Sequence, residues 1–126
     1  MSTKEKTPLF LRSVALIKAI PSGKVLTYSE VANLIGAPGC ARHISFVLSS
    51  SSKKYDLPWH RVVNSKGKIS LPVHNHYFRQ KKLLENEGIL FIEDKIDLKS
   101  YLWKPSKSLL NKTLKGIPKH IPLRAR

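Results

Sequence analysis

The sequence has one cysteine, few acidic residues and no long apolar run, and each scarcity excludes a class of protein. A single cysteine, Cys40, cannot form an intramolecular disulfide or a cysteine-rich zinc site. The five histidines show no ligand spacing, so we expect no metal and no cofactor. No apolar run approaches the roughly 18 residues of a membrane span, and the first ten residues lack the apolar region of a secretory signal. We therefore expect an intracellular protein, nuclear in a eukaryote and otherwise cytoplasmic.

Acidic residues are outnumbered by basic ones, which predicts a polyanionic partner. Among 126 residues, 8 Asp and Glu stand against 23 Lys and Arg, for a formal net charge of +15. Such an excess most often indicates nucleic acid binding. A membrane surface would require a basic helix with a broad apolar face, and we expect no membrane association.

The basic charge is uneven along the chain and suggests a boundary near residue 103. Residues 73–103 carry equal numbers of basic and acidic side chains, whereas residues 104–126 carry seven basic and no acidic ones. This last segment also contains three prolines and few aromatic residues. We therefore predict a globular domain over residues 1–103 and a flexible basic tail over residues 104–126.

The whole chain, with 41 % hydrophobic and 25 % charged residues, has a globular composition, and helical signals dominate the domain. Thr7 can cap a helix over Pro8–Ala19, with proline at the first helical position. Another helix is predicted over about Tyr77–Glu87. Residues Asn64–Lys68 have turn chemistry, and Ile69–Leu71 can return as a short strand, which predicts a small hairpin.

Two short helices joined by a tight turn predict a helix-turn-helix. Thr27 and Glu30 form a T-x-x-E capping box ahead of the first helix, which Gly36 ends. The second begins near Cys40 and continues through Leu48. This arrangement is typical of DNA-binding domains but also occurs in other helical proteins.

Five separated motifs along residues 8–103 are more specific. They occur in the order Ile20-Pro-x-Gly-x-Val25, Thr27-Tyr28, Ala37-Pro38, Ala41-Arg42 and Pro58-x-His60-Arg61-Val62-Val63. Together they resemble the DNA-binding domain of O6-alkylguanine-DNA alkyltransferases. The alkyltransferases carry Pro-Cys-His-Arg at their reactive site, where this sequence has Trp59 in place of the cysteine. Tryptophan at this position is typical of the alkyltransferase-like proteins.

The resemblance implies a fold and a function. The fold is mainly α with a small β hairpin, a winged helix-turn-helix-like DNA-binding domain, and we expect a monomer. The partner is double-stranded DNA containing O6-alkylguanine, recognised by base flipping without chemistry. Nucleotide excision repair proteins would then act on the flagged lesion.

The resemblance also implies a lesion pocket. Trp59 would line it where the reactive cysteine otherwise stands, offering apolar area and a π-face to an alkylated base. His60 and Glu87 match a histidine and a glutamate that relay a proton from the thiol in the alkyltransferases. Val62 and Val63 would supply the pocket wall.

A second set of residues is implied to contact DNA. Arg42 is the finger expected to enter the duplex and fill the space of the extruded nucleotide, since a planar cation can stack between bases. Tyr28 would press on the phosphate side of the flipped nucleotide. Ser51 stands where the family has an asparagine hinge. The set is completed by Thr27, Ala41 and Arg61.

Two other functions remain open. One is an active alkyltransferase using Cys40, because dealkylation needs a thiolate and an indole has none. The other is a general helix-turn-helix DNA-binding protein. Within the resemblance, Phe46 is bulkier than the usual residue of the second helix. Some members carry a pocket arginine soon after the hairpin, for which His74 or His76 is a candidate substitute.

Overall fold

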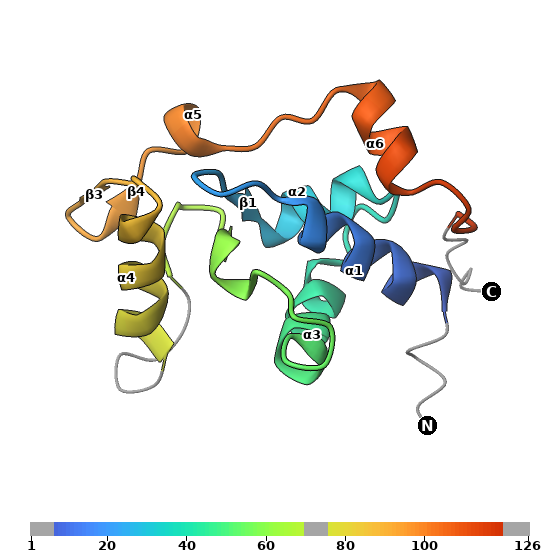
Figure 1. Ribbon diagram of the computed structural model, residues 1–126, viewed down its shortest axis with the longest axis horizontal. Coiled ribbons are helices and arrows are strands. Elements are labelled where there is room, and N and C mark those ends of the chain that lie inside the picture. The colour runs from blue at the N-terminus through green and yellow to red at the C-terminus, as the bar shows by residue number, and fades with distance from the viewer. Residues whose placement is uncertain (1–6, 70–75, 120–126) are drawn as a thin grey trace.

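The computed structural model describes residues 7–69 and 76–119, and helices make up most of this part of the chain (Figure 1). The mainly helical fold predicted from the sequence is confirmed. Its helices are α1 (Pro8–Ala19), α2 (Tyr28–Leu34), α3 (Ala41–Ser51), α4 (Phe78–Asn86), α5 (Leu98–Tyr101) and α6 (Lys107–Thr113), and η2 (Trp59–Arg61) is a 3-10 turn. Its strands are β1 (Leu26–Thr27), β2 (Val62–Val63), β3 (Phe91–Ile92) and β4 (Lys95–Ile96).

The predicted caps define the first helices. The Thr7 hydroxyl accepts a hydrogen bond from the backbone N–H of Phe10 at 3.1 Å, and the Thr27 hydroxyl accepts one from Glu30 at 3.0 Å. Each satisfies a donor that the first helical turn leaves unpaired. Between α2 and α3 the chain turns at Gly36, whose φ of 86° favours glycine. The helix-turn-helix is therefore present.

The β structure differs from the predicted hairpin. The turn at Asn64–Lys68 is present, with the N–H of Asn64 bonded to the carbonyl of Lys68 at 3.0 Å. Ile69 forms no strand, however, and residues 70–71 lie outside the described residues. Strand β2 pairs instead in parallel with β1, with Leu26 opposite Val62. The hairpin of this fold is β3–β4, where Phe91 lies opposite Ile96.

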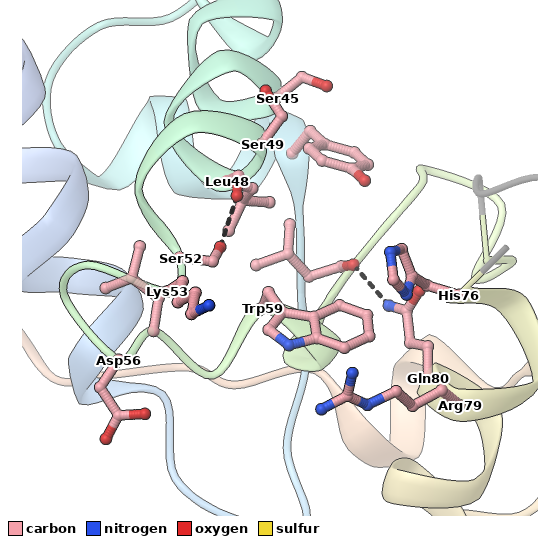
Figure 2. Close-up of a pocket in the computed structure, with 13 residues that line it drawn as sticks. Ser45, Leu48, Ser49, Ser52, Lys53, Asp56, Trp59, His76, Arg79 and Gln80 are labelled. Carbon is pink, nitrogen blue, oxygen red and sulfur yellow. Dashed lines mark hydrogen bonds between the residues drawn. The ribbon is translucent and has the colours of Figure 1, made fainter.

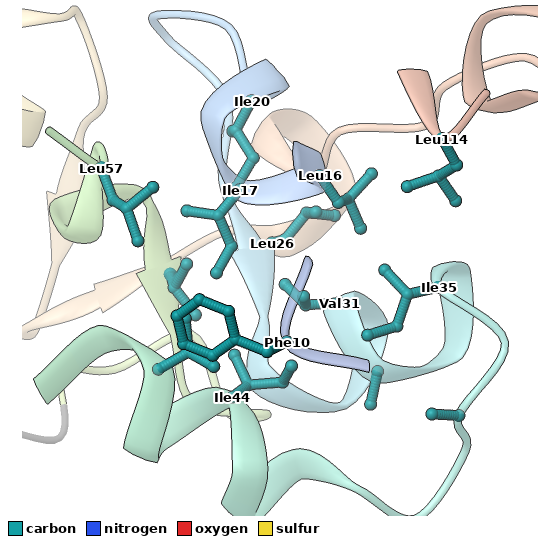
Figure 3. Packing of buried hydrophobic residues seen from close by; sticks show 14 residues of the cluster. Phe10, Leu16, Ile17, Ile20, Leu26, Val31, Ile35, Ile44, Leu57 and Leu114 are labelled. Atoms are coloured by element: carbon teal, nitrogen blue, oxygen red, sulfur yellow. The ribbon is translucent and has the colours of Figure 1, made fainter. Parts of the chain in front are cut away.

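The main core lies between α1 and the helix-turn-helix (Figure 3). Buried apolar side chains at helical spacing on α1 face those of α2 and α3, so the burial of this stripe holds the three helices together. The fully buried members include Phe10, Leu16, Ile17, Leu26, Val31, Ile35, Ile44 and Val47. A smaller cluster joins β2 to α4 and the hairpin, through Val25, Val63, Leu84, Ile89 and Ile96.

The predicted flexible tail is wrong for residues 107–114. Helix α6 lies beside α1, and Leu114 at its end is buried in the main core (Figure 1). Arg12 of α1 ties this segment to the helix-turn-helix. Its Nε donates to the carbonyl of Ile35 at 2.8 Å and its Nη1 to the carbonyl of Ile117 at 3.2 Å. The buried Leu114 and the hydrogen bond from Arg12 to Ile117 thus hold the basic segment against the domain.

Replacing Arg12 with glutamine is expected to lower the free energy of unfolding by about 1–2 kcal/mol, because two carbonyls lose a charged donor. Urea denaturation of the full chain measures the change. Lys18→Gln, at an exposed position of the same helix, is the matched control and should change stability little. Equal stability of Arg12→Gln and Lys18→Gln would show that the Arg12 contacts contribute nothing.

Candidate functional site

The pairing of β1 with β2 brings two distant motifs together. Strand β1 leads directly into α2 at Tyr28, and β2 directly follows the η2 turn that begins at Trp59. With Leu26 opposite Val62, both Tyr28 and Trp59 line one pocket of about 760 Å³ (Figure 2). A volume of this size is typical of pockets that hold a small organic ligand.

Tyr28 at the start of α2 and three further segments form the walls of this pocket. Helix α3 and the turn after it supply small polar groups and two charged side chains, and η2 and β2 supply apolar surface. Helix α4, with His76 before it, supplies the opposite side (Figure 2). The lining residues are Tyr28, Ser45, Leu48, Ser49, Ser52, Lys53, Asp56, Leu57, Trp59, Val62, His76, Arg79 and Gln80.

Trp59 lies between the α3 side and the α4 side of the pocket and is only partly buried (Figure 2). The His76 ring packs edge-on against the indole, with centroids 5.8 Å apart, and the guanidinium carbon of Arg79 lies 5.9 Å from the indole centroid. Buried Gln80 fixes the backbone that carries the indole, since its amide donates to the carbonyls of His60 at 3.0 Å and Val62 at 3.1 Å. The indole is therefore held in place with part of its surface available to a ligand.

Behind the η2 turn, Glu87 is the centre of a charged cluster. Its carboxylate accepts hydrogen bonds from Arg61 Nη2 at 2.7 Å, from His60 Nε2 at 2.8 Å and from the backbone N–H of Gly23 at 3.1 Å. Burial alone would raise the pKa of Glu87. The donors from Arg61, His60 and Gly23 outweigh burial and lower the pKa to about 2. This carboxylate is thus ionised at neutral pH and joins η2 to the end of α4.

A family model of the DNA-binding domain of 6-O-methylguanine DNA methyltransferase matches residues 8–89. The chain belongs to this family. It is 49 % identical over 92 residues to a DNA base-flipping protein of Vibrio parahaemolyticus, a match covering 72 % of this chain and 91 % of that protein. It is 40 % identical over 92 residues to alkyltransferase-like protein 1 of Schizosaccharomyces pombe, covering 68 % and 85 % respectively.

Solved structures of the methyltransferase-domain family share the fold. S. pombe Atl1 in complex with damaged DNA containing O6-carboxymethylguanine matches with a TM-score of 0.71 at 33 % identity, over 83 % of this chain and all of that one. The O6-methylguanine methyltransferase of Mycobacterium tuberculosis matches with a TM-score of 0.54 at 28 % identity, over 69 % of this chain and 49 % of that one. The expected alkyltransferase-like DNA-binding fold is confirmed.

Of the residues expected in the pocket, some line it and others lie outside it. Trp59 and Val62 line it. His60 and Glu87 lie in the charged cluster behind η2 and do not line it, and Val63 is buried in the smaller core cluster.

The residues expected to contact DNA also lie in different places. Arg42 is exposed in the first turn of α3, beside half-buried Ala41. Ser51 is fully buried at the end of α3, and its neighbour Ser52 lines the pocket instead. Thr27 caps α2, and Tyr28 lines the pocket. Arg61 contacts Glu87 in the charged cluster.

Phe46, noted above for its bulk, and Cys40, the single thiol of the sequence, both pack against the main core. Phe46 is half-buried and packs against the main core. Cys40 precedes α3, is half-buried against the same core and does not line the pocket.

Sequence reasoning missed several pocket residues. The pocket serines are Ser45 and Ser49 of α3 and Ser52, which caps its C-terminal end, and this spacing places them on one helical face once α3 is known to extend to Ser51. Arg79 and Gln80 belong to a predicted helix, but nothing local indicated which face meets η2. Of the two candidate histidines, His76 lines the pocket, and His74 lies outside the described residues. Within the described residues there is no group of three His, Cys, Asp or Glu that could hold a metal ion, and no helix has the length and hydropathy to span a membrane.

Proposed function

We propose that this protein binds duplex DNA containing O6-alkylguanine, flips the damaged base into the pocket around Trp59 and leaves the base chemically unchanged. The observation that carries the proposal is the partly exposed indole that lines a pocket beside a helix-turn-helix. An indole offers a flipped purine a flat apolar surface on which to stack. The names of the relatives, a base-flipping protein and an alkyltransferase-like protein, support the same function.

The position of the Cys40 thiol argues against alkyl transfer from the lesion to this protein. Alkyl transfer to protein needs a thiolate placed in line with the alkyl carbon. Cys40 is the only cysteine of the sequence, and it packs against the core at the start of α3 without lining the pocket. Trp59, in the Pro58-x-His60-Arg61 element, offers no comparable nucleophile. The protein therefore recognises the lesion and does not repair it.

The proposal assigns roles to the remaining residues as well. Tyr28, on the pocket wall, presses on the backbone of the flipped nucleotide, and Arg42, exposed on α3, enters the duplex. Extruding a base costs a few kcal/mol, so a group that fills the gap favours the flipped state. His60, Arg61 and Glu87 brace the η2 turn that presents Trp59. The bound complex would flag the lesion for nucleotide excision repair. The protein would then act in the compartment that holds the cell's DNA.

Arg42→Ala is expected to weaken binding to lesion duplex roughly tenfold, because the extruded base leaves an unfilled space. A fluorescent base analogue beside the lesion reports flipping, and its signal should fall with binding. Arg42→Lys is the sharper variant, since lysine keeps the charge and loses the planar stacking surface. Full recovery of the flipping signal in Arg42→Lys would show a phosphate contact and contradict the finger role.

A salt-controlled binding titration tests the proposed function. Matched duplexes with O6-methylguanine and with guanine are titrated with the full chain at several salt concentrations. We expect tighter binding to the lesion at every salt concentration, with similar salt slopes because the phosphate contacts are shared. Equal affinities for the two duplexes would favour a general helix-turn-helix DNA-binding protein.

A further inference from the structure

Two cationic side chains and one acidic side chain line the pocket, and the cations include Arg79 beside the indole. Arg79 extends from the first turn of α4, and Lys53 follows α3. In Figure 2 Arg79 reaches the Trp59 indole from α4, whereas Asp56 and Lys53 lie on the α3 side. The pocket therefore has a positive side at α4.

Arg79 has no ion pair among residues 7–69 and 76–119, unlike two nearby cations. Lys81 of the same helix pairs with Asp94 at 3.0 Å, and Arg61 pairs with Glu87 at 2.7 Å. The guanidinium carbon of Arg79 lies 5.9 Å from the Trp59 centroid, within the range of a cation–π contact. That contact restricts where the guanidinium can go while leaving N–H donors on its edge available.

A planar guanidinium held beside an aromatic surface is suited to a carboxylate. Its N–H donors match two carboxylate oxygens, and such charge-assisted hydrogen bonds are stronger than neutral ones. A neutral alkyl group of the same size can accept no hydrogen bond there and gains only apolar contact. The pocket thus discriminates by charge as well as by size.

We propose that Arg79, assisted by Lys53, makes this pocket favour O6-guanine adducts that end in a carboxylate over neutral alkyl adducts of similar length. The inference rests on the proposed function and names the lesion class that the site binds best. Arg79 is a specificity-determining residue in this account: it contacts the O6 substituent, while Trp59 stacks on the base.

The test compares three duplexes that differ only at one guanine: unmodified guanine, O6-propylguanine and O6-carboxymethylguanine. The full-length protein should bind the carboxymethyl duplex roughly tenfold more tightly than the propyl duplex, the effect of one good charge-assisted hydrogen bond. Arg79→Gln should bring this ratio close to one, and Lys53→Gln should lower it partly. Lys82→Gln removes one positive charge from an exposed position of α4 outside the pocket, and should leave the ratio unchanged.

The outcomes separate the inference from the function beneath it. If Arg79→Gln weakens binding to all three duplexes equally, Arg79 contacts phosphate and the inference is wrong. It is also wrong if the unaltered protein binds both adducts equally while preferring them to guanine, and the proposed function then stands. Failure to prefer either adduct over guanine would overturn the function and the inference together.

Discussion

Trp59→Ala is expected to abolish the preference for O6-alkylguanine while retaining binding to undamaged duplex. Stacking of a base on an aromatic side chain contributes about 1–3 kcal/mol, so affinity for the lesion should fall roughly tenfold to a hundredfold. The phosphate contacts that hold normal DNA depend on the lysines and arginines of the surface and remain. Competition titrations with lesion and guanine duplexes measure the ratio directly.

Two further measurements make this result specific. Trp59→Phe keeps an aromatic face and should retain most of the preference, whereas a loss equal to that of alanine would require the indole itself. The unfolding midpoint of each variant shows whether the fold is intact. It should change little, because Trp59 is only partly buried. A folded Trp59→Ala protein that still prefers the lesion would place the flipped base elsewhere.

Glu87→Gln is expected to lower the free energy of unfolding by about 2–3 kcal/mol. The substitution leaves the partly buried guanidinium of Arg61 without its anion, and breaking one side of such a pair is costly. Glu85→Gln is the matched control, since Glu85 is exposed near the end of α4, two residues before Glu87. Urea denaturation at neutral pH should show a large loss for Glu87→Gln and little change for Glu85→Gln.

The pH dependence of stability should identify the same carboxylate. Glu87 has a pKa of about 2 in the folded protein against a reference value of 4.5. A lowered pKa contributes stability that is fully present above pH 4.5 and is lost as the pH falls towards 2. The unaltered protein should lose more stability over this range than Glu87→Gln. Parallel pH profiles for the two proteins would contradict a stabilising role for the carboxylate.

Local signals predicted the helices well, and long-range contacts explain where prediction failed. The Thr7 and Thr27 caps and the spacing of apolar residues are properties of one segment, and they placed α1 and α2 correctly. The order of α6 depends on Leu114 reaching the core and on Arg12 bonding to Ile117, a residue more than a hundred positions away. A basic, proline-containing segment shows neither contact in its own sequence.

The prediction of strand pairing was wrong for a similar reason. Strands β1 and β2 have two residues each, too few for alternation to show, and their parallel pairing joins Leu26 to a residue far along the chain. The turn at Asn64–Lys68 has its own chemistry and was predicted, but turn chemistry does not determine which strand the flanking residues join.

The site was predictable where it follows a motif. Trp59 and Tyr28 belong to motifs quoted from the sequence, and both line the pocket. Arg79 and Gln80 were missed because a short polar helix gives no local indication of the face that meets η2. That face is determined by packing, through the hydrogen bonds from buried Gln80 to the carbonyls of His60 and Val62.

The most direct test of recognition without chemistry is to measure the masses of the protein and of the DNA strands after incubation. The full chain is incubated in excess with duplex containing O6-methylguanine, and intact masses of protein and DNA strands are measured after denaturation. We predict that both masses are unchanged, although a native measurement before denaturation shows the complex. Protein heavier by one methylene, together with a DNA strand lighter by the same mass, would contradict the account.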